Sequence, residues 1–186
     1  MSSRDMFVVM HSDVWGPCST SSINGCIRYF VSFIYCFSCV TWLHLMKNKN
    51  KVFAFFKDFH RAAQTQYGEV LKVLRFDNGT KYANITFRAY FSDHIIHHQT
   101  TCTYTPTQNG VVERRNKHPL EVTRSMMISM NVLKQLWGRT MLTVVALINR
   151  MPSRDLEWKF PCEFLQGDSS GILPLKVFGC VFCKGD

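Results

Sequence analysis

The sequence predicts an α/β domain in which a mixed sheet is flanked by helices. Three observations support this fold class. The length of 186 residues is typical of one domain, and the hydrophobic fraction of 46% is sufficient for a core. The hydrophobic period also changes several times along the chain between that of a strand and that of a helix. The resulting order is three strands, a helix, a strand, a helix, a strand and then helices, which is typical of helices packed on a sheet.

Short runs of β-branched and aromatic residues predict the strands. These runs lie at Phe7–Met10, Arg28–Ile34, Val40–Leu45, Val70–Phe76 and Ile95–His98. Residues with helical spacing predict a first helix over Lys51–Gln66, which Gly68 ends. Further helices are predicted at Phe87–Asp93, Val111–Met130 and Leu133–Asn149, with a loop at Thr100–Gly110.

Two other interpretations of apolar segments are weaker. Tyr29–Met46 is uncharged over 18 residues, close to the lower limit for a membrane helix, but its composition fits two buried strands joined by a turn better. Cys36/Cys39 and Cys180/Cys183 have the spacing of zinc ligands. Because 140 residues separate the pairs, buried reduced thiols are the preferred interpretation. We therefore expect no membrane association.

The net charge of +9 is concentrated in the first 150 residues, which hold 18 basic and 8 acidic residues. Residues 151–186 hold 4 basic and 5 acidic residues. A basic body favours a polyanionic partner, most often nucleic acid, although a merely soluble basic protein has the same composition.

Three acidic residues are placed where chemistry is common in such folds. Asp13 follows the first predicted strand, Asp77 ends the fourth, and Glu113 opens a helix, with 35 residues between Asp77 and Glu113. Carboxylates at strand ends project into the crevice where ligands bind, and hard oxygen ligands suit Mg²⁺ or Mn²⁺. Two such ions can activate an attacking oxygen and stabilise a leaving oxygen. The alternative is that Asp77-Asn78-Gly79 is only a turn and Glu113 only a helix N-terminal charge.

Five stretches resemble the integrase catalytic core of Ty1/copia-type LTR retrotransposons, in family order. They are HSDVWGP (His11–Pro17), RYFVSFI (Arg28–Ile34), KVLRFDNG (Lys72–Gly79), HHQTTCTYTPTQNGVVERRN (His97–Asn116) and LINRMPSR (Leu147–Arg154). The resemblance implies an RNase H-like fold with a mixed five-stranded sheet. It also implies a nuclear polynucleotidyl transferase that processes and joins element DNA ends. At the matching motif positions, the resemblance implies that Asp13, Asp77 and Glu113 are the catalytic residues and the ligands of two Mg²⁺ or Mn²⁺ ions.

The same resemblance supplies candidate DNA contacts, with element ends and target DNA as partners and a homo-oligomer as the working form. The candidates lie in the loop before the helix of Glu113 and on that helix: Tyr104, Gln108, Asn109, Arg114, Arg115 and Lys117. Cations here would contact phosphates without reading sequence. Solvated basic side chains and an ordinary surface loop are the alternatives.

Four departures from the family pattern favour a degenerate or domesticated core that binds nucleic acid without catalysis. A polar turn has become Tyr35–Cys39, Phe76 replaces a serine before Asp77, and Thr103 replaces a proline. Pro119 lies inside the helix of Glu113, where it is expected to break or kink the helix between Glu113 and Leu120. Pro119→Leu is then expected to raise thermal stability and any strand-transfer activity. An RNase H-type nuclease of the same fold has no feature of its own in this sequence.

We expect residues 5–165 to form the integrase-like core and residues 166–186 to begin a truncated C-terminal extension. The chain is expected to be a fragment that lacks an upstream zinc module and a downstream DNA-binding region. His11 is expected to be structural, and Trp15 and Trp42 are expected to lie in the core rather than stack on bases.

Overall fold

The computed structural model describes residues 9–23, 26–67, 71–76, 85–100 and 106–163. Within these ranges, the side chains of residues 100, 106–116 and 155 are outside the description. The predictions for Tyr104, Thr103 and the extension at 166–186 therefore lie outside the described residues, as does Asp77.

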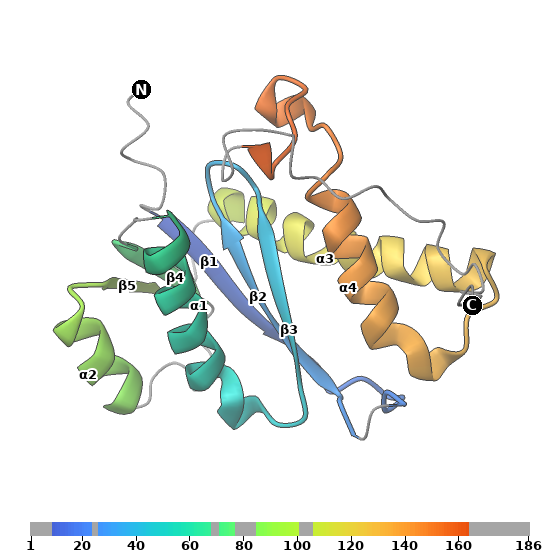
Figure 1. The fold of residues 1–186 in the computed structure, drawn as a ribbon, viewed down its shortest axis with the longest axis horizontal. Coiled ribbons are helices and arrows are strands. Elements are labelled where there is room, and N and C mark those ends of the chain that lie inside the picture. The colour runs from blue at the N-terminus through green and yellow to red at the C-terminus, as the bar shows by residue number, and fades with distance from the viewer. Residues whose placement is uncertain (1–8, 24–25, 68–70, 77–84, 101–105, 164–186) are drawn as a thin grey trace, which may run out of the picture.

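The centre of the molecule is a mixed five-stranded sheet with the strand order β3-β2-β1-β4-β5 (Figure 1). Its strands are β1 (Val9–Trp15), β2 (Tyr29–Tyr35), β3 (Thr41–Met46), β4 (Val73–Phe76) and β5 (His97–Thr100). β2 is antiparallel to β1 and β3, whereas β4 is parallel to β1 and β5. The C-terminal ends of β1, β3, β4 and β5 consequently lie at the same end of the sheet. We call this row of strand ends the carboxyl edge, as distinct from the edge strands β3 and β5.

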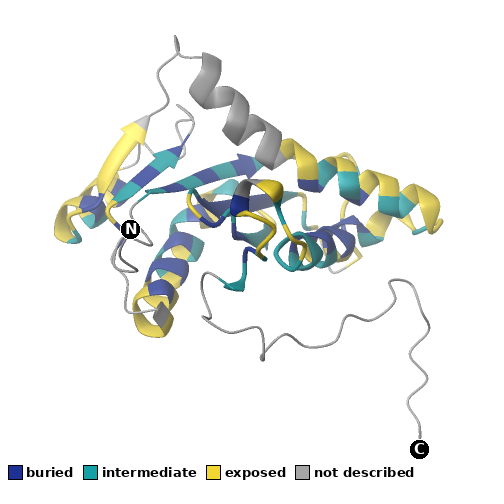
Figure 2. Ribbon diagram, turned by 90° about the horizontal axis from the view of Figure 1, so that it is seen from above, coloured by how far each residue is buried: buried dark blue, intermediate teal, exposed yellow. Residues whose placement is uncertain are grey.

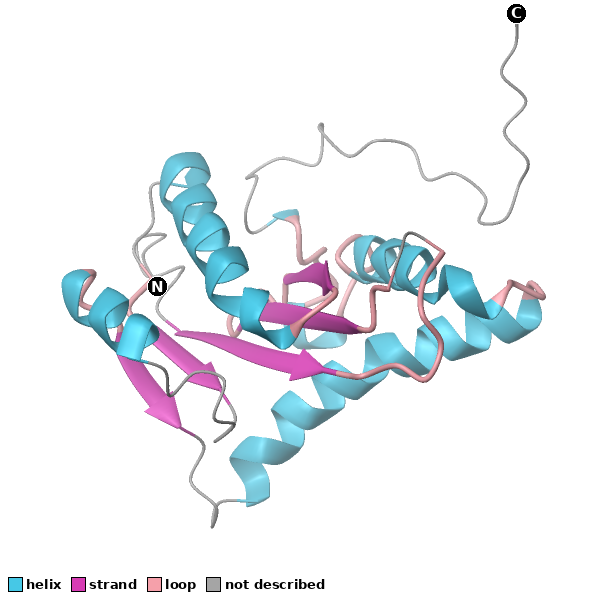
Figure 3. Cartoon of the chain, turned by 90° about the horizontal axis from the view of Figure 1, so that it is seen from below, coloured by secondary structure: helices cyan, strands magenta, loops and turns pink. Residues whose placement is uncertain are grey.

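Helices cover both faces of this sheet (Figures 1 and 3). They are α1 (Val52–Tyr67), α2 (Ile85–Asp93), α3 (Pro106–Ser129) and α4 (Trp137–Ile148), with 3₁₀ turns η2 (Lys49–Lys51), η3 (Lys134–Leu136) and η4 (Arg154–Leu156). The aromatic side chains of α1 and α2 pack on one face. α3 and α4 lie on the other face, where α4 approaches closely at Gly138: a Cβ there would be 3.0 Å from Leu45 Cδ1.

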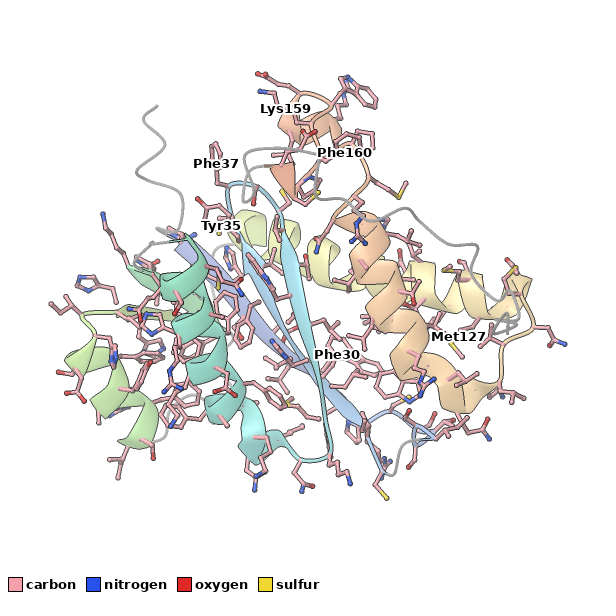
Figure 4. All side chains as sticks on the ribbon, in the orientation of Figure 1. Phe30, Tyr35, Phe37, Met127, Lys159 and Phe160 are labelled. Carbon is pink, nitrogen blue, oxygen red and sulfur yellow. The ribbon has the colours of Figure 1, made fainter. Side chains whose placement is uncertain are left out.

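The alternation of side chains along the central strands decides which residues face which helices. Val31, Phe33 and Tyr35 of β2 point into the core beneath α1 and α2. Phe30 points the other way and packs with Trp137 and Met141 of α4 (Figure 4 shows Phe30 on this side of the sheet). Burial alternates along β1 in the same way, whereas β2 is buried on both of its faces (Figure 2 shows the chain coloured by burial).

The predicted fold class is confirmed, and so are the strand interpretation of Tyr29–Met46 and the core placement of two tryptophans. Tyr29–Met46 forms β2, β3 and the turn between them. Among the described residues, no helix is long and apolar enough to cross a membrane. Trp15 stacks on Phe30 with ring centroids 5.4 Å apart, and Trp42 packs edge-on against Phe59 at 5.1 Å. Cys36 and Cys39 are reduced thiols in the β2–β3 turn, but they are half-buried rather than buried as expected.

Two predicted boundaries that bear on the candidate site are wrong. The first strand extends to Trp15, so Asp13 lies within β1 rather than after it, because the pairing with β2 continues through Trp15. The predicted loop at Thr100–Gly110 is also too long: Thr100 ends β5, and α3 begins at Pro106. Proline is favoured at the first position of a helix, where its missing N–H would have no partner.

Of the break or kink expected at Pro119, the break is wrong, because α3 continues as one helix through that residue (Figure 3). Pro119 is buried. Its carbonyl accepts a 2.7 Å hydrogen bond from the hydroxyl of Thr123, and that hydroxyl also lies 3.0 Å from the sulfur of Met141 on α4. Packing of α3 against α4 therefore outweighs the local preference of proline, as tertiary contacts often do.

Candidate active site

Asp13 lies on the face of the sheet that α3 and α4 cover. In β1 the even-numbered Met10, Ser12 and Val14 are buried, and Met10 and Val14 belong to the core beneath α1 and α2. Residues 9, 11, 13 and 15 alternate with them, and Trp15 packs in the core beside α4. Asp13 is half-buried, and its partner on β2 is Ser32, a buried serine. A rigid central strand thus holds this carboxylate near the carboxyl edge.

The adjacent strand leads directly to the second predicted acidic residue. β4 pairs with β1 in a parallel register that ends with Ser12 opposite Phe76, the residue before Asp77. Phe76 is 3% exposed and stacks on His98 with ring centroids 4.2 Å apart. The phenylalanine that replaces the family's serine is therefore a core residue.

Glu113 lies in the first half of α3, and its side chain is outside the described residues. Further along the helix, Leu120 and Met127 pack against the core beside Phe30, Trp137 and Met141. α3 is thus held on the same face of the sheet that carries Asp13.

The candidate DNA contacts are only partly described. Lys117 is exposed on α3. The backbones of Gln108, Asn109, Arg114 and Arg115 also lie on α3, but their side chains are outside the described residues. The helical assignment corrects the interpretation of Gln108 and Asn109 as loop residues.

Two residues that the sequence analysis did not select have clear roles here. Arg75 pairs in register with His11, on the Asp13 face, and its Nε donates a 2.8 Å hydrogen bond to Gln99 Oε1. The strand alternation two residues before Asp77 was the signal that could have found it. Asn149 binds both backbone groups of Thr41: its Nδ2 donates to the carbonyl at 2.8 Å and its Oδ1 accepts from the N–H at 2.9 Å. Asn149 belongs to the LINRMPSR motif, so its motif position was the available signal.

Histidines with lowered pKa values lie on the opposite face, away from Asp13. Burial lowers the pKa of His60, and the nearby His94 lowers it further. Tyr90 shares a 2.9 Å hydrogen bond with His60 Nδ1, whereas the buried His60 Nε2 has no partner. Burial also lowers the pKa of His44 and of His98. These groups belong to the packing of α1, α2 and the sheet rather than to the acidic site.

The donors predicted for a metal are chemically suitable, since carboxylate oxygens are the ligands that Mg²⁺ and Mn²⁺ prefer. Asp13 and the adjoining end of β4 lie at one edge of the sheet, beside the face that α3 covers. Among the side chains that the structure describes, no three of His, Cys, Asp and Glu are close enough to hold a metal ion. The described residues thus supply one carboxylate of the predicted set.

Comparison with known proteins identifies the class. No protein-family model matches the chain. It is 39% identical over 172 residues, 92% of its length, to the Retrovirus-related Pol polyprotein from transposon TNT 1-94 of Nicotiana tabacum. The chain spans 13% of that polyprotein.

Solved structures with the same fold are retroviral integrases. The simian T-cell lymphotropic virus intasome in complex with PP2A regulatory subunit B56 gamma aligns with a TM-score of 0.67 and 17% identity, covering 95% of this chain and 60% of that one. The HTLV-2 integrase catalytic core domain in complex with magnesium aligns with a TM-score of 0.61 and 14% identity, covering 86% and 96%.

The fold and the homology define an RNase H-like core of the polynucleotidyl transferase superfamily. More specifically, the chain belongs to the copia-type retrotransposon Pol family and corresponds to its integrase region. The resemblance inferred from the motifs is thereby confirmed.

Proposed function

We propose that this chain is the catalytic core of a nuclear retrotransposon integrase, comprising residues 5–165, which processes and joins element DNA ends. The observation that supports it most strongly is the position of Asp13 on a rigid strand beside the end of β4, on the face that α3 covers. DNA is the substrate, and a homo-oligomer is the working form. The similar intasome and the magnesium complex of HTLV-2 integrase support these two assignments by analogy.

The geometry of the described residues supports convergence of all three carboxylates. If the β1–β4 register continues by one residue beyond Ser12 and Phe76, Asp77 stands beside Asp13 on the same face. Glu113 precedes Leu120 by seven residues, or two helical turns, so both occupy one side of α3, and Leu120 packs toward the sheet. Asp13, Asp77 and Glu113 would hold two Mg²⁺ or Mn²⁺ ions, which supply charge stabilisation and an activated oxygen nucleophile.

The reaction comprises two in-line phosphoryl transfers. In the first, a water oxygen bonds to phosphorus and the P–O bond to a 3′ oxygen breaks, which leaves a 3′ hydroxyl on the element end. In the second, that hydroxyl attacks a phosphorus of target DNA and displaces a 3′ oxygen of the target strand. The residues of the chain hold the carboxylates in position and bind phosphates. Lys117, Arg114 and Arg115 follow Glu113 on α3, while Tyr104, Gln108 and Asn109 precede it.

The alternative, a degenerate core that binds nucleic acid without catalysis, has less support from the described residues than from the sequence. α3 continues through Pro119, and Phe76 and Tyr35 are buried in the core rather than disturbing the site. Phe37 alone of the altered turn's aromatic residues is a large exposed hydrophobic group, at 48% exposure, and it extends from the hairpin tip (Figure 4).

The test is Mg²⁺-dependent strand transfer with terminal DNA of a related element. Asp13→Asn, Asp77→Asn and Glu113→Gln should each reduce joining by about a hundredfold or more, while DNA binding persists. The matched controls are Asp93→Asn and Glu121→Gln, which change exposed carboxylates on α2 and further along α3. If the parent joins DNA and all three variants still do so, the assignment is overturned. If the parent binds DNA but joins none, the degenerate core is favoured.

A further inference from the structure

A second basic surface lies at the carboxyl edge, apart from the basic residues of α3. It consists of Arg28, Lys47, Lys49 and Lys51, and we call it the basic edge. Arg28 precedes β2, Lys47 follows β3, and Lys49 and Lys51 lie in η2. Their backbones are joined, because the N–H of Arg28 donates a 3.2 Å hydrogen bond to the carbonyl of Met46.

The side chains of the basic edge are accessible and partly fixed. Arg28, Lys47 and Lys51 are exposed. The Nε of Arg28 donates a 3.0 Å hydrogen bond to the carbonyl of Cys18. The ammonium of Lys49 lies 5.3 Å from the centroid of the Tyr29 ring, where a cation–π attraction holds it.

Acidic neighbours in the sequence do not neutralise this charge. The chain contains no Asp or Glu from Val14 to Lys57. The first carboxylate after the basic edge is Asp58, on α1. Its charge opposes the lowering of the pKa of His44, in the middle of β3, by burial. A cluster of cations with no acidic residue in its own segment complements a polyanion such as a phosphate backbone.

The topology places the basic edge beside Asp13. Asp13 is opposite Ser32 and Ser32 is opposite Leu43, so two strand spacings separate β1 from β3 at this level. Lys47 lies four residues beyond Leu43, which gives a separation of roughly 15 Å between the backbones of Asp13 and Lys47. Measured along the axis of a duplex, that distance corresponds to about four or five phosphates of one strand.

From these observations we infer that the basic edge binds the phosphate backbone of DNA on the β3 side of the acidic site. The inference rests on the proposed function for its choice of DNA as the polyanion. The surface is separate from α3, and its contacts to phosphate give affinity and orientation without sequence readout. An anionic membrane surface is the competing partner, but the position beside Asp13 favours DNA.

The test is binding of the full chain to an unrelated DNA duplex, measured by fluorescence anisotropy between about 50 and 200 mM salt in EDTA. The triple variant Lys47→Gln, Lys49→Gln and Lys51→Gln should weaken binding at least about tenfold at the lowest salt. It should also reduce the slope of log affinity against log salt by about two to three, since each lost phosphate contact contributes about 0.9.

The matched control removes three exposed cations near the opposite edge: Lys72→Gln, Arg154→Gln and Lys159→Gln. It should change the slope by less than about one. Equal losses in both triples, or stronger binding of the parent to phosphatidylserine vesicles than to DNA, would overturn the inference. Because the measurement needs neither metal nor turnover, it can succeed or fail independently of strand transfer, and a parent that binds no DNA overturns both proposals.

Discussion

The two faces of the sheet are packed very differently. Beneath α1 and α2, the described residues form a core of 16 buried side chains that is rich in phenylalanine. Within it, the ring of Phe33 packs against the rings of both Phe56 and Phe59. On the α3–α4 face, the corresponding cluster has three buried members, Phe30, Trp137 and Met141, surrounded by half-buried residues. The larger core stabilises the fold, and the face with the smaller core carries Asp13.

This difference indicates how the chain combines stability with a reactive site. A cluster of carboxylates needs water, cations and room for a polyanion, so the face that holds it is not sealed by a continuous apolar layer. α3 is held on this face by Leu120, Met127 and the link from Thr123 to Met141.

The largest expected effect comes from emptying the larger core. Phe56 is fully buried at 0% exposure, so Phe56→Ala should lower the free energy of unfolding by about 3–5 kcal/mol. Met141→Ala, on the other face, should cost about 2–3 kcal/mol, because half-buried neighbours can move into the space. Urea unfolding of both variants measures the difference. A greater loss from Met141→Ala would contradict the assigned roles of the two faces.

The next effect concerns α3. Pro119 supplies no N–H to the carbonyl four residues earlier, which costs a helix interior about 3 kcal/mol. Pro119→Leu should restore that hydrogen bond, and the added side chain can enter the adjacent cleft of about 630 Å³ lined by Ile34, Ile148 and Met151. We expect a higher melting temperature and higher strand-transfer activity. A melting temperature equal to that of the parent would mean that the fold already compensates for the proline.

The smallest effect is that of pH on the larger core, where His44, His60 and His98 lie. Burial is the main cause of the lowered pKa of each. The unfolded chain therefore binds more protons than the folded one just below the ordinary histidine pKa of about 6.5. Stability is fully present above this pH and falls as the pH drops, by at most about 1.4 kcal/mol per unit for each histidine.

The variant His60→Phe isolates the contribution of one histidine. It should reduce the slope of unfolding free energy against pH between about 5 and 6.5. Gln64→Ala, at an exposed position on α1, is the control: it removes no titratable group and should leave the slope unchanged. An unchanged slope in His60→Phe would show that His60 binds protons equally in the folded and unfolded states, so that it makes no contribution to the pH dependence.

The fold was largely predictable from local patterns, because strands and helices here differ in period and composition. The errors came from contacts that no local pattern records. Pairing with β2 extended β1 through Asp13, and packing against α4 kept α3 continuous at Pro119. Of the candidate site, Asp13 could be selected from the sequence. The face of the sheet on which its side chain lies could be assigned only once the strand pairing was known. Arg75 was passed over because its role depends on the register between β1 and β4.

The side chain of Asn149 has a consequence for how copies of this chain meet. β3 is an edge strand, and an edge offers unpaired N–H and C=O groups to any extended segment that approaches. By binding both backbone groups of Thr41, the Asn149 amide occupies the place that a peptide group of a sixth strand would take. The sheet is thereby closed to strand addition at this point. Asn149, the C-cap residue of α4, thus opposes aggregation through pairing of exposed sheet edges.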